Sequence, residues 1–208
     1  MEIILASGSP RRAQLLEQVG IAHRVVVSDV DETSLTTNPT LLVTELAMRK
    51  AEAVIKALGA SANGAIVISA DTIVYHQGEI LGKPANPQQA LEILTSLQGC
   101  THAVYTGVAI ISSPLAESCP GKGGAVSSHS KVFYDRAEVT FRNLCQEEIL
   151  AYIATGEPFD KAGAYGIQGR GSALVERING DFYTVMGLPI SKVCTALASL
   201  GYNYWQGL

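Results

Sequence analysis

The chain of 208 residues is long enough for one domain with a sizeable buried core. Apolar residues make up 47% of the chain and charged residues 16%, which excludes a largely disordered protein. The formal net charge of −4 does not favour binding to nucleic acid, so an anionic ligand must be held by a local cluster of Lys and Arg.

The location expected from the sequence is the cytoplasm. The four cysteines have no CxxC spacing, which favours buried or free thiols over disulfides. The apolar run near Glu2 is too short for a signal peptide, and no window approaches the ~18 apolar residues of a membrane span. We therefore expect no membrane partner.

The first half of the chain alternates expected strands and helices. Residues 2–6 form a short apolar run followed by Ser-Gly-Ser-Pro, which is typical of a buried strand and a turn. Ser9 can cap a helix that has Pro10 at its first position and ends at Gly20. The further elements expected are strands at 23–27 and 65–70, helices at 41–58 and 87–97, and a hairpin with arms at 72–75 and 79–81.

The second half adds two longer strands, at 103–111 and 132–141. Residues 112–130, between these strands, are rich in Ser, Gly and Pro and are expected to form an exposed loop. The elements expected after them are a helix at 146–154, an irregular glycine-rich segment at 156–171, strands at 173–178 and 182–185, and a helix at 188–200. This order predicts an α/β fold with a mixed sheet, and we expect one domain over residues 1–208.

The first candidate site lies between the first strand and the first helix. Backbone N–H groups near Ser7 and Ser9, together with the helix dipole, attract an anion. Arg11 and Arg12 in the first helical turn are unfavourable against that dipole unless an anion offsets their charge, and Arg can grip phosphate with two parallel bonds. The alternative is a solvated basic turn.

The second candidate is Lys50, which falls inside the apolar stripe of the helix at 41–58, between Val43 and Val54. A lysine in this position either extends to the edge of the core or points into a cleft that holds a negative partner. A cleft is favoured only if other charged groups converge on it.

The third candidate is Asp71, which directly follows the apolar run at 65–70. Ligand sites in α/β sheets lie beyond strand ends, so a carboxylate here is placed to bind a metal or to accept a proton from water. The alternative is a turn or cap residue. Lys83 follows the hairpin and is expected to return toward the same end of the sheet.

The fourth candidate is the glycine-rich segment 156–169. Its glycines can bring the backbone close to a ligand, and Gln168 carries both an amide donor and an acceptor for a base edge. A flexible loop is the alternative, but the apolar and aromatic residues in the segment argue against a solvated linker.

Taken together, these residues resemble the Maf family of nucleotide pyrophosphatases. The matching segments are Ala6-Ser7-Gly8-Ser9-Pro10-Arg11-Arg12, Asp31-Glu32, Lys50-Ala51, Ala70-Asp71-Thr72, Gly82-Lys83-Pro84, Tyr105-Thr106-Gly107-Val108, residues 160–169, Ile178-Asn179-Gly180-Asp181 and Val185-Met186-Gly187-Leu188-Pro189. The resemblance implies an α/β fold related to the inosine triphosphate pyrophosphatases, in which a long mixed sheet forms two lobes around a cleft.

The implied reaction is attack of water on the α-phosphorus of a nucleoside triphosphate, with pyrophosphate leaving and Mg²⁺ or Mn²⁺ assisting. By resemblance, Asp71, Glu32 and Lys83 are catalytic, with Asp71 as proton acceptor and Asp71 and Glu32 as metal ligands. The substrate-binding residues implied by resemblance are Ser7, Ser9, Arg11, Arg12, Lys50, Thr72, Lys161 and Gln168.

The resemblance is greatest to the family branch that acts on dTTP and UTP, because Arg11, Thr72 and Gln168 match positions tied to specificity. Modified pyrimidine triphosphates are further expected substrates, and a homodimer is expected. The loop at 112–130 is longer than the typical connection and is expected either to cover the cleft or to form a dimer contact. Two alternatives are a nucleotide-binding regulator of cell division that needs no turnover and a related enzyme that acts on purine triphosphates such as ITP.

Overall fold

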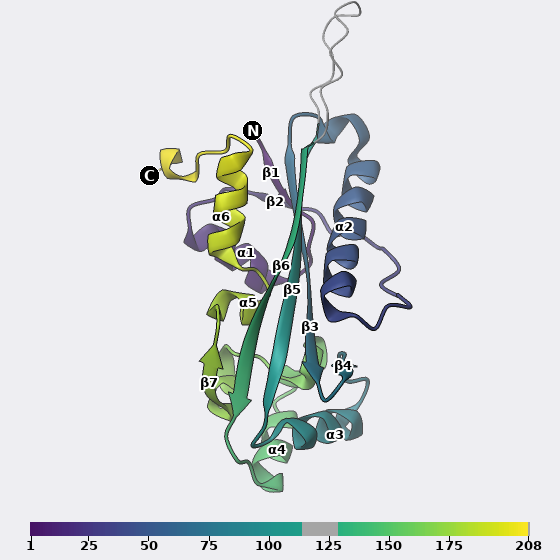
Figure 1. The fold of residues 1–208 in the computed structure, drawn as a ribbon, viewed down its shortest axis with the longest axis vertical. Helices are drawn as coiled ribbons and strands as arrows, with labels where there is room; N and C mark the ends of the chain where they lie inside the picture. Colours follow the sequence, from purple (N-terminus) through teal and green to yellow (C-terminus); the bar gives the residue numbers. More distant parts are fainter. Residues whose placement is uncertain (114–128, 208) are drawn as a thin grey trace, which may run out of the picture.

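The computed structural model describes residues 1–113 and 129–207, which form a mixed α/β fold around one seven-stranded sheet (Figure 1). The strand order is β2-β1-β3-β5-β6-β7, and β4 pairs with β3. β1 pairs in parallel with β2 and β3, whereas the other pairings are antiparallel. The α/β class with a mixed sheet is therefore confirmed.

The strands are β1 (Ile3–Leu5), β2 (Arg24–Val25), β3 (Ile66–His76), β4 (Glu79–Leu81), β5 (Thr101–Ser112), β6 (His129–Phe141) and β7 (Val175–Asn179). The α-helices are α1 (Pro10–Gln18), α2 (Pro39–Leu58), α3 (Pro87–Leu97), α4 (Gln146–Ile153), α5 (Phe182–Met186) and α6 (Ile190–Ser199). Short 3-10 helices lie at Gly59–Ala62, Glu157–Asp160, Ala162–Ala164, Gly169–Leu174 and Tyr204–Gly207.

The helix boundaries follow from local chemistry. The Asn38 side chain accepts hydrogen bonds from the backbone N–H groups of Thr40 and Leu41, and Pro39 occupies the first turn of α2. Gly59 caps the C-terminus of the helix, and its φ is +52°, a conformation that L side chains rarely adopt. α2 therefore begins two residues before the predicted start and ends at Leu58, as predicted.

Three sequence predictions about elements are wrong. The strand at 65–70 and the first hairpin arm at 72–75 are one strand, β3, so Asp71 lies within a strand and not after one. A carboxylate is tolerated there because it is paired with Lys50. The expected strand at 182–185 is helix α5, because the Asp181 side chain caps it at Tyr183 and Thr184.

The third correction concerns the loop at 112–130. β5 continues through Ser112 and β6 begins at His129, so both ends of that segment belong to strands. Residues 114–128 lie outside the described residues.

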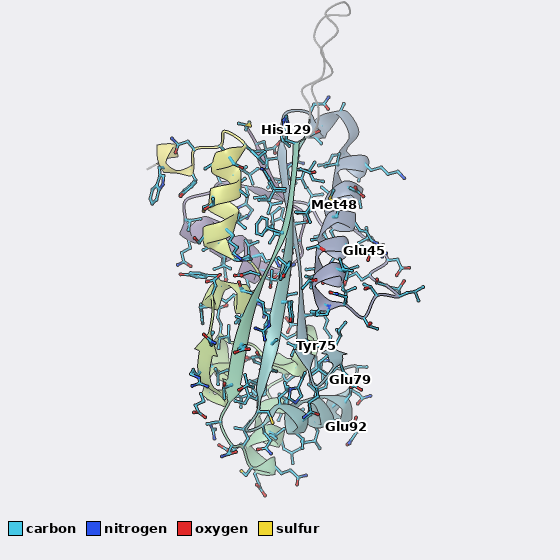
Figure 2. All side chains as sticks on the ribbon, viewed as in Figure 1. Glu45, Met48, Tyr75, Glu79, Glu92 and His129 are labelled. Carbon is cyan, nitrogen blue, oxygen red and sulfur yellow. The ribbon has the colours of Figure 1, made fainter. Side chains whose placement is uncertain are left out.

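The sheet joins two lobes. In the upper lobe, α2 covers one face of β3 and β5, and α1 and α6 cover the other (Figure 1). In the lower lobe, α3, α4 and the 3-10 helices between Glu157 and Leu174 surround a second core built on Val74, Val104 and Phe141. Figure 2 shows Glu45 on α2, beside the upper half of the sheet, and Tyr75 on β3, in the lower half of the sheet. β5 and β6 run through both lobes.

No helix in the described ranges is both long and apolar enough to cross a bilayer.

Candidate functional site

One edge of β3 is shared between two strands. β1 pairs with β3 from Ile66 to Ile68, and β4 pairs with it from Val74 to His76. Within the described part of the chain, the residues between these pairings have no strand on that edge. Three of them, Asp71, Thr72 and Ile73, line a cavity of about 550 Å³ between the lobes. A cleft between two lobes is what the family resemblance of the sequence implies.

The cavity has a charged part and an apolar part. Its charged lining residues are Arg11, Arg12, Glu32, Lys50, Asp71, Lys83, Asp160 and Lys161. Its apolar lining includes Leu42, Leu46, Ile73, Val74, Val104, Tyr165, Ile167, Val185 and Met186. Such a cavity suits a ligand with a highly charged end and a flat or apolar end.

Lys50 forms ion pairs with both acidic candidate residues, Asp71 and Glu32. Its Nζ lies 2.6 Å from Oδ1 of Asp71 and 2.9 Å from Oε1 of Glu32. The side chains of Lys50 and Asp71 are 12% and 10% exposed, whereas that of Glu32 is 55% exposed. Lys50 therefore points into a cleft with negative partners, which decides between the two alternatives for a lysine on an apolar stripe.

The acidic residue in the loop before α2 is held in its ionised form. Burial raises the pKa of Glu32, but the hydrogen bond and charge of Lys50, with smaller contributions from Lys83 and Arg12, bring the net pKa below its ordinary value. Glu32 thus remains a carboxylate beside the cations of the cavity.

Arg12 connects four segments of the protein. Its Nε donates to the carbonyl oxygen of Gly187 at 2.8 Å, and its Nη1 donates to Ala70 O at 2.8 Å and to Ser7 Oγ at 3.1 Å. Its Nη2 donates to Thr72 Oγ1 at 3.0 Å. Burial lowers the pKa of Arg12, while Asp71 acts in the opposite direction. Most of its donors are therefore used by protein acceptors, and Arg11, which also lines the cavity, is the less constrained of the two arginines.

The glycine-rich segment is organised by Glu157. The Tyr152 hydroxyl donates to its Oε1 at 3.1 Å, and the backbone N–H groups of Arg170 and Gly171 donate to its carboxylate at 3.0 and 3.1 Å. Lys161 Nζ donates to the carbonyl oxygen of Glu157 at 2.7 Å. The segment is therefore a folded wall of the cavity and not a flexible loop.

The loop that carries Lys83 is held at the cavity by a backbone hydrogen bond of the preceding residue, Gly82. The N–H of Gly163 donates to Gly82 O at 3.1 Å, which ties the loop after β4 to the glycine-rich segment. Lys83 and Lys161 then line the same cavity as Lys50.

Two candidates lie outside the lining. Gln168 is exposed, and its neighbour Ile167 lines the cavity instead. Ser7 is buried and accepts a hydrogen bond from Arg12, so its hydroxyl supports the site from behind, whereas Ser9 lines the cavity.

Sequence reasoning missed Tyr165 as a lining residue. Its hydroxyl lies 2.8 Å from Nε2 of His102, a residue that is only 3% exposed. The only sequence signal for this role was an aromatic residue within the glycine-rich segment. Its hydrogen-bond partner His102 lies 63 residues away in sequence, so no local pattern links the two.

The acidic pair suits a divalent cation. Mg²⁺ is commonly bound by one or two carboxylates together with substrate phosphates, and it does not need a cage made only of protein atoms. Asp71 and Glu32 converge on one positive charge, the ammonium of Lys50, at hydrogen-bonding distance. The described residues contain no group of three or more His, Cys, Asp or Glu that could hold a metal.

Comparisons with known proteins cover nearly the whole chain. A family model described as Maf-like protein matches residues 2–200. The dTTP/UTP pyrophosphatase of Bacillus cereus (strain ATCC 10987 / NRS 248) is 49% identical over 197 residues, which cover 94% of this chain and 88% of that protein. The dTTP/UTP pyrophosphatase of Bacillus anthracis is 48% identical over 197 residues, which cover 94% of each chain.

Among solved structures, the Ham1 protein of Staphylococcus aureus aligns with 84% of this chain and 80% of its own, with 17% identity and a TM-score of 0.45. The family match, by contrast, includes every residue that lines the cavity.

Proposed function

The chain belongs to the Maf family, and from this premise we propose that it hydrolyses dTTP and UTP to the nucleoside monophosphate and pyrophosphate. The observation that supports this proposal best is the meeting of Asp71 with Lys50, Arg11 and Lys83 in one cavity between the lobes. Curated relatives at 48% and 49% identity carry the name dTTP/UTP pyrophosphatase.

In the proposed reaction, the cations of the cavity hold the triphosphate. Arg11, Lys83 and Lys161 neutralise phosphate oxygens, and Ser9 donates a hydrogen bond near the start of α1. Arg12 shapes the same region by fixing Ser7 and Thr72. Phosphoryl chemistry depends mainly on positioning and charge stabilisation, which this cluster can supply.

Asp71 is the proposed proton acceptor. Its Oδ1 accepts a hydrogen bond from Lys50 at 2.6 Å, and its Oδ2 is assigned to the water that attacks the α-phosphorus. Mg²⁺ or Mn²⁺, held by Asp71 and Glu32, would supply further charge stabilisation for the triphosphate. Lys50 offsets the charge of the Asp71 carboxylate and fixes its orientation in the cavity.

The nucleoside is assigned to the apolar part of the cavity, between Val74, Tyr165 and Ile167. The preference for pyrimidines, including modified pyrimidine triphosphates, is a proposal that depends on the relatives and on the resemblance at Arg11, Thr72 and Gln168. Thr72 Oγ1 bonds to both Arg12 and Thr106, so its proposed role is to fix the wall of the cavity.

The test is a substrate panel with separate assays for pyrophosphate and phosphate. The purified protein is incubated with dTTP, UTP, CTP, ITP and 7-methyl-GTP in the presence of Mg²⁺. Pyrophosphate is expected from dTTP and UTP and is expected to disappear in Asp71→Asn, while nucleotide binding survives. Asp29→Asn, an exposed aspartate outside the cavity lining, is the matched control.

Other outcomes separate the alternatives. Free phosphate with a diphosphate product would contradict attack at the α-phosphorus, and faster turnover of ITP would assign the chain to purine triphosphates. Binding of dTTP or UTP without any turnover would support the regulator of cell division.

We further propose one domain over residues 1–208, a homodimer and a cytoplasmic location. The first proposal is supported by β3 and β5, which contribute side chains to the cores of both lobes. The other two follow from the family resemblance and are tested by light scattering of the purified protein and by cell fractionation.

A further inference from the structure

Lys50 occupies the point at which the two acidic side chains of the cavity converge. Asp71 comes from β3, Glu32 from the loop before α2, and Lys50 from the middle of α2. The ammonium lies 2.6 and 2.9 Å from one oxygen of each carboxylate. Lys50 is therefore the counter-ion of this pair.

We infer that Lys50 couples metal binding to nucleotide binding. In the nucleotide-free protein its ammonium keeps a divalent cation away from Asp71 and Glu32, and substrate phosphates relieve this exclusion. The inference rests on the proposed function, because it takes these carboxylates as the ligands of the metal.

The exclusion follows from geometry and charge. Mg²⁺ binds carboxylate oxygens at about 2.0–2.1 Å, so a cation bound to both oxygens would lie within a few ångströms of Nζ. Like charges at that distance repel strongly where water is partly excluded, and the Lys50 side chain is only 12% exposed. The ammonium and the divalent cation therefore compete for the same two carboxylates.

Substrate phosphates can remove this competition. The ammonium of lysine is a compact charge on a flexible stem, so it can turn toward a phosphate oxygen while the stem remains packed. Of its two contacts, the one to Glu32 is the more easily exchanged, because that carboxylate is 55% exposed whereas that of Asp71 is 10% exposed. By linkage, metal and nucleotide then raise each other's affinity by the same factor.

The experiment measures Mn²⁺ binding by the electron paramagnetic resonance signal of the free ion. Wild-type protein is titrated alone and in the presence of a saturating α,β-imido analogue of dTTP, with the analogue alone as a blank. We expect wild-type protein to bind Mn²⁺ at least about tenfold more tightly with the analogue than without it. Nucleotide-free Lys50→Met is expected to bind Mn²⁺ at least about tenfold more tightly than nucleotide-free wild type, because the competing charge is gone.

Two further variants make the result specific. Lys50→Arg keeps the positive charge and should keep Mn²⁺ affinity low, as in wild type. Lys56→Met removes an exposed charge from the last turn of the same helix and should leave both titrations unchanged. If Lys50→Met does not fold, as judged by circular dichroism, Lys50→Gln replaces it.

Mn²⁺ binding to nucleotide-free Lys50→Met or Lys50→Gln that is equal to or weaker than that of wild type would overturn the inference. Equal Mn²⁺ affinity of wild type with and without the analogue would overturn it as well. Neither result bears on the proposed function, which the pyrophosphate assay tests on its own. Conversely, a protein without turnover still gives a complete Mn²⁺ titration.

Discussion

Asp71 and Thr72 are neighbours in β3 and point to opposite faces of the sheet, yet both line the same cavity. Asp71 contacts Lys50 on the α2 side, whereas Thr72 Oγ1 accepts a hydrogen bond from Arg12 on the α1 side. Both contacts are possible because no strand pairs with this edge of β3 between Ile68 and Val74 in the described part of the chain. The cavity can therefore reach both faces of the sheet at this edge. One dipeptide therefore joins the acidic and the basic parts of the site.

Arg12→Lys is expected to destabilise the protein as well as reduce turnover. A lysine ammonium cannot reach the acceptors of Ala70, Gly187 and Thr72 in the fork geometry of a guanidinium, so carbonyl groups lose their partners. The free energy of unfolding should fall by roughly 2–3 kcal/mol, measured by urea denaturation.

Arg24→Lys is the control for Arg12, since its ion pair with Glu2 is exposed. It should change the free energy of unfolding by no more than about 1 kcal/mol. Unchanged stability of Arg12→Lys would show that the four bonds of Arg12 do not hold the site together.

Gly107→Ala is expected to displace α2 and with it Lys50. A Cβ on Gly107 would lie 2.3 Å from the backbone carbon and oxygen of Val43, so the helix would have to move. Gly107 pairs directly with Asp71 in the sheet, so the shift separates Lys50 from its partner. We expect a loss of about 1–3 kcal/mol in unfolding free energy and at least about a tenfold fall in kcat/KM.

The stability change of Gly107→Ala is best compared with that of Gly82→Ala, where an added Cβ meets no atom within 4 Å. Equal unfolding free energies for the two variants would contradict the close approach of α2 to β5.

Arg49→Met is expected to act on catalysis only through Glu32. Nη1 of Arg49 donates to the carbonyl oxygens of Thr33 at 2.8 Å and Asp31 at 3.4 Å, which lie on either side of Glu32. Loss of these bonds should loosen the loop and lower kcat by about 5- to 20-fold. In a Glu32→Gln background the same substitution should have little further effect, and full additivity in this double-mutant cycle would refute the proposed role.

His102 is expected to make stability dependent on pH. Burial, with a smaller contribution from His76, lowers the pKa of His102 to about 3 from its ordinary value of 6.5. The contribution of the neutral His102 to the free energy of unfolding is therefore fully present above its ordinary pKa of 6.5. It falls as pH drops from 6.5 toward 3, because in this range only the unfolded chain binds the proton. Between about pH 7.5 and pH 5.0 this group should account for a loss of about 2 kcal/mol in the free energy of unfolding.

The measurement for His102 is urea denaturation at both pH values. His102→Gln should flatten the pH dependence whatever its absolute stability, while His129→Gln, an exposed histidine of β6, should keep it. Parallel pH profiles for wild type and His102→Gln would exclude the buried histidine as the cause.

The sequence predicted the elements whose signals are local. The α/β class and α2 were accessible because Asn38, Pro39 and Gly59 mark the ends of the helix by their own chemistry. The continuity of β3 was not accessible, because Asp71 is tolerated only through Lys50, which lies 21 residues away on α2. Helix α5 was missed because its β-favouring residues are outweighed by a cap and by tertiary packing.

For the site, the position of Lys50 on an apolar stripe left two alternatives open, and its contacts with Asp71 and Glu32 in the structure decide for the cleft. The role of Arg12 as a structural clamp was not predictable, since its bond to Gly187 spans 175 residues. The geometry around Gln168 likewise depends on how the glycine-rich segment folds against Glu157, which no local pattern encodes.

The strands β5 and β6 pass through both lobes without interruption. A hinge between the lobes would have to break their ladder of paired residues, so bending at one linker is not available to this molecule. Any narrowing of the cavity around a nucleotide must instead come from a change in the twist of the sheet or from side chains and loops at its rim. The same continuity means that neither lobe is a separable module, because removing either lobe would cut through β5 and β6.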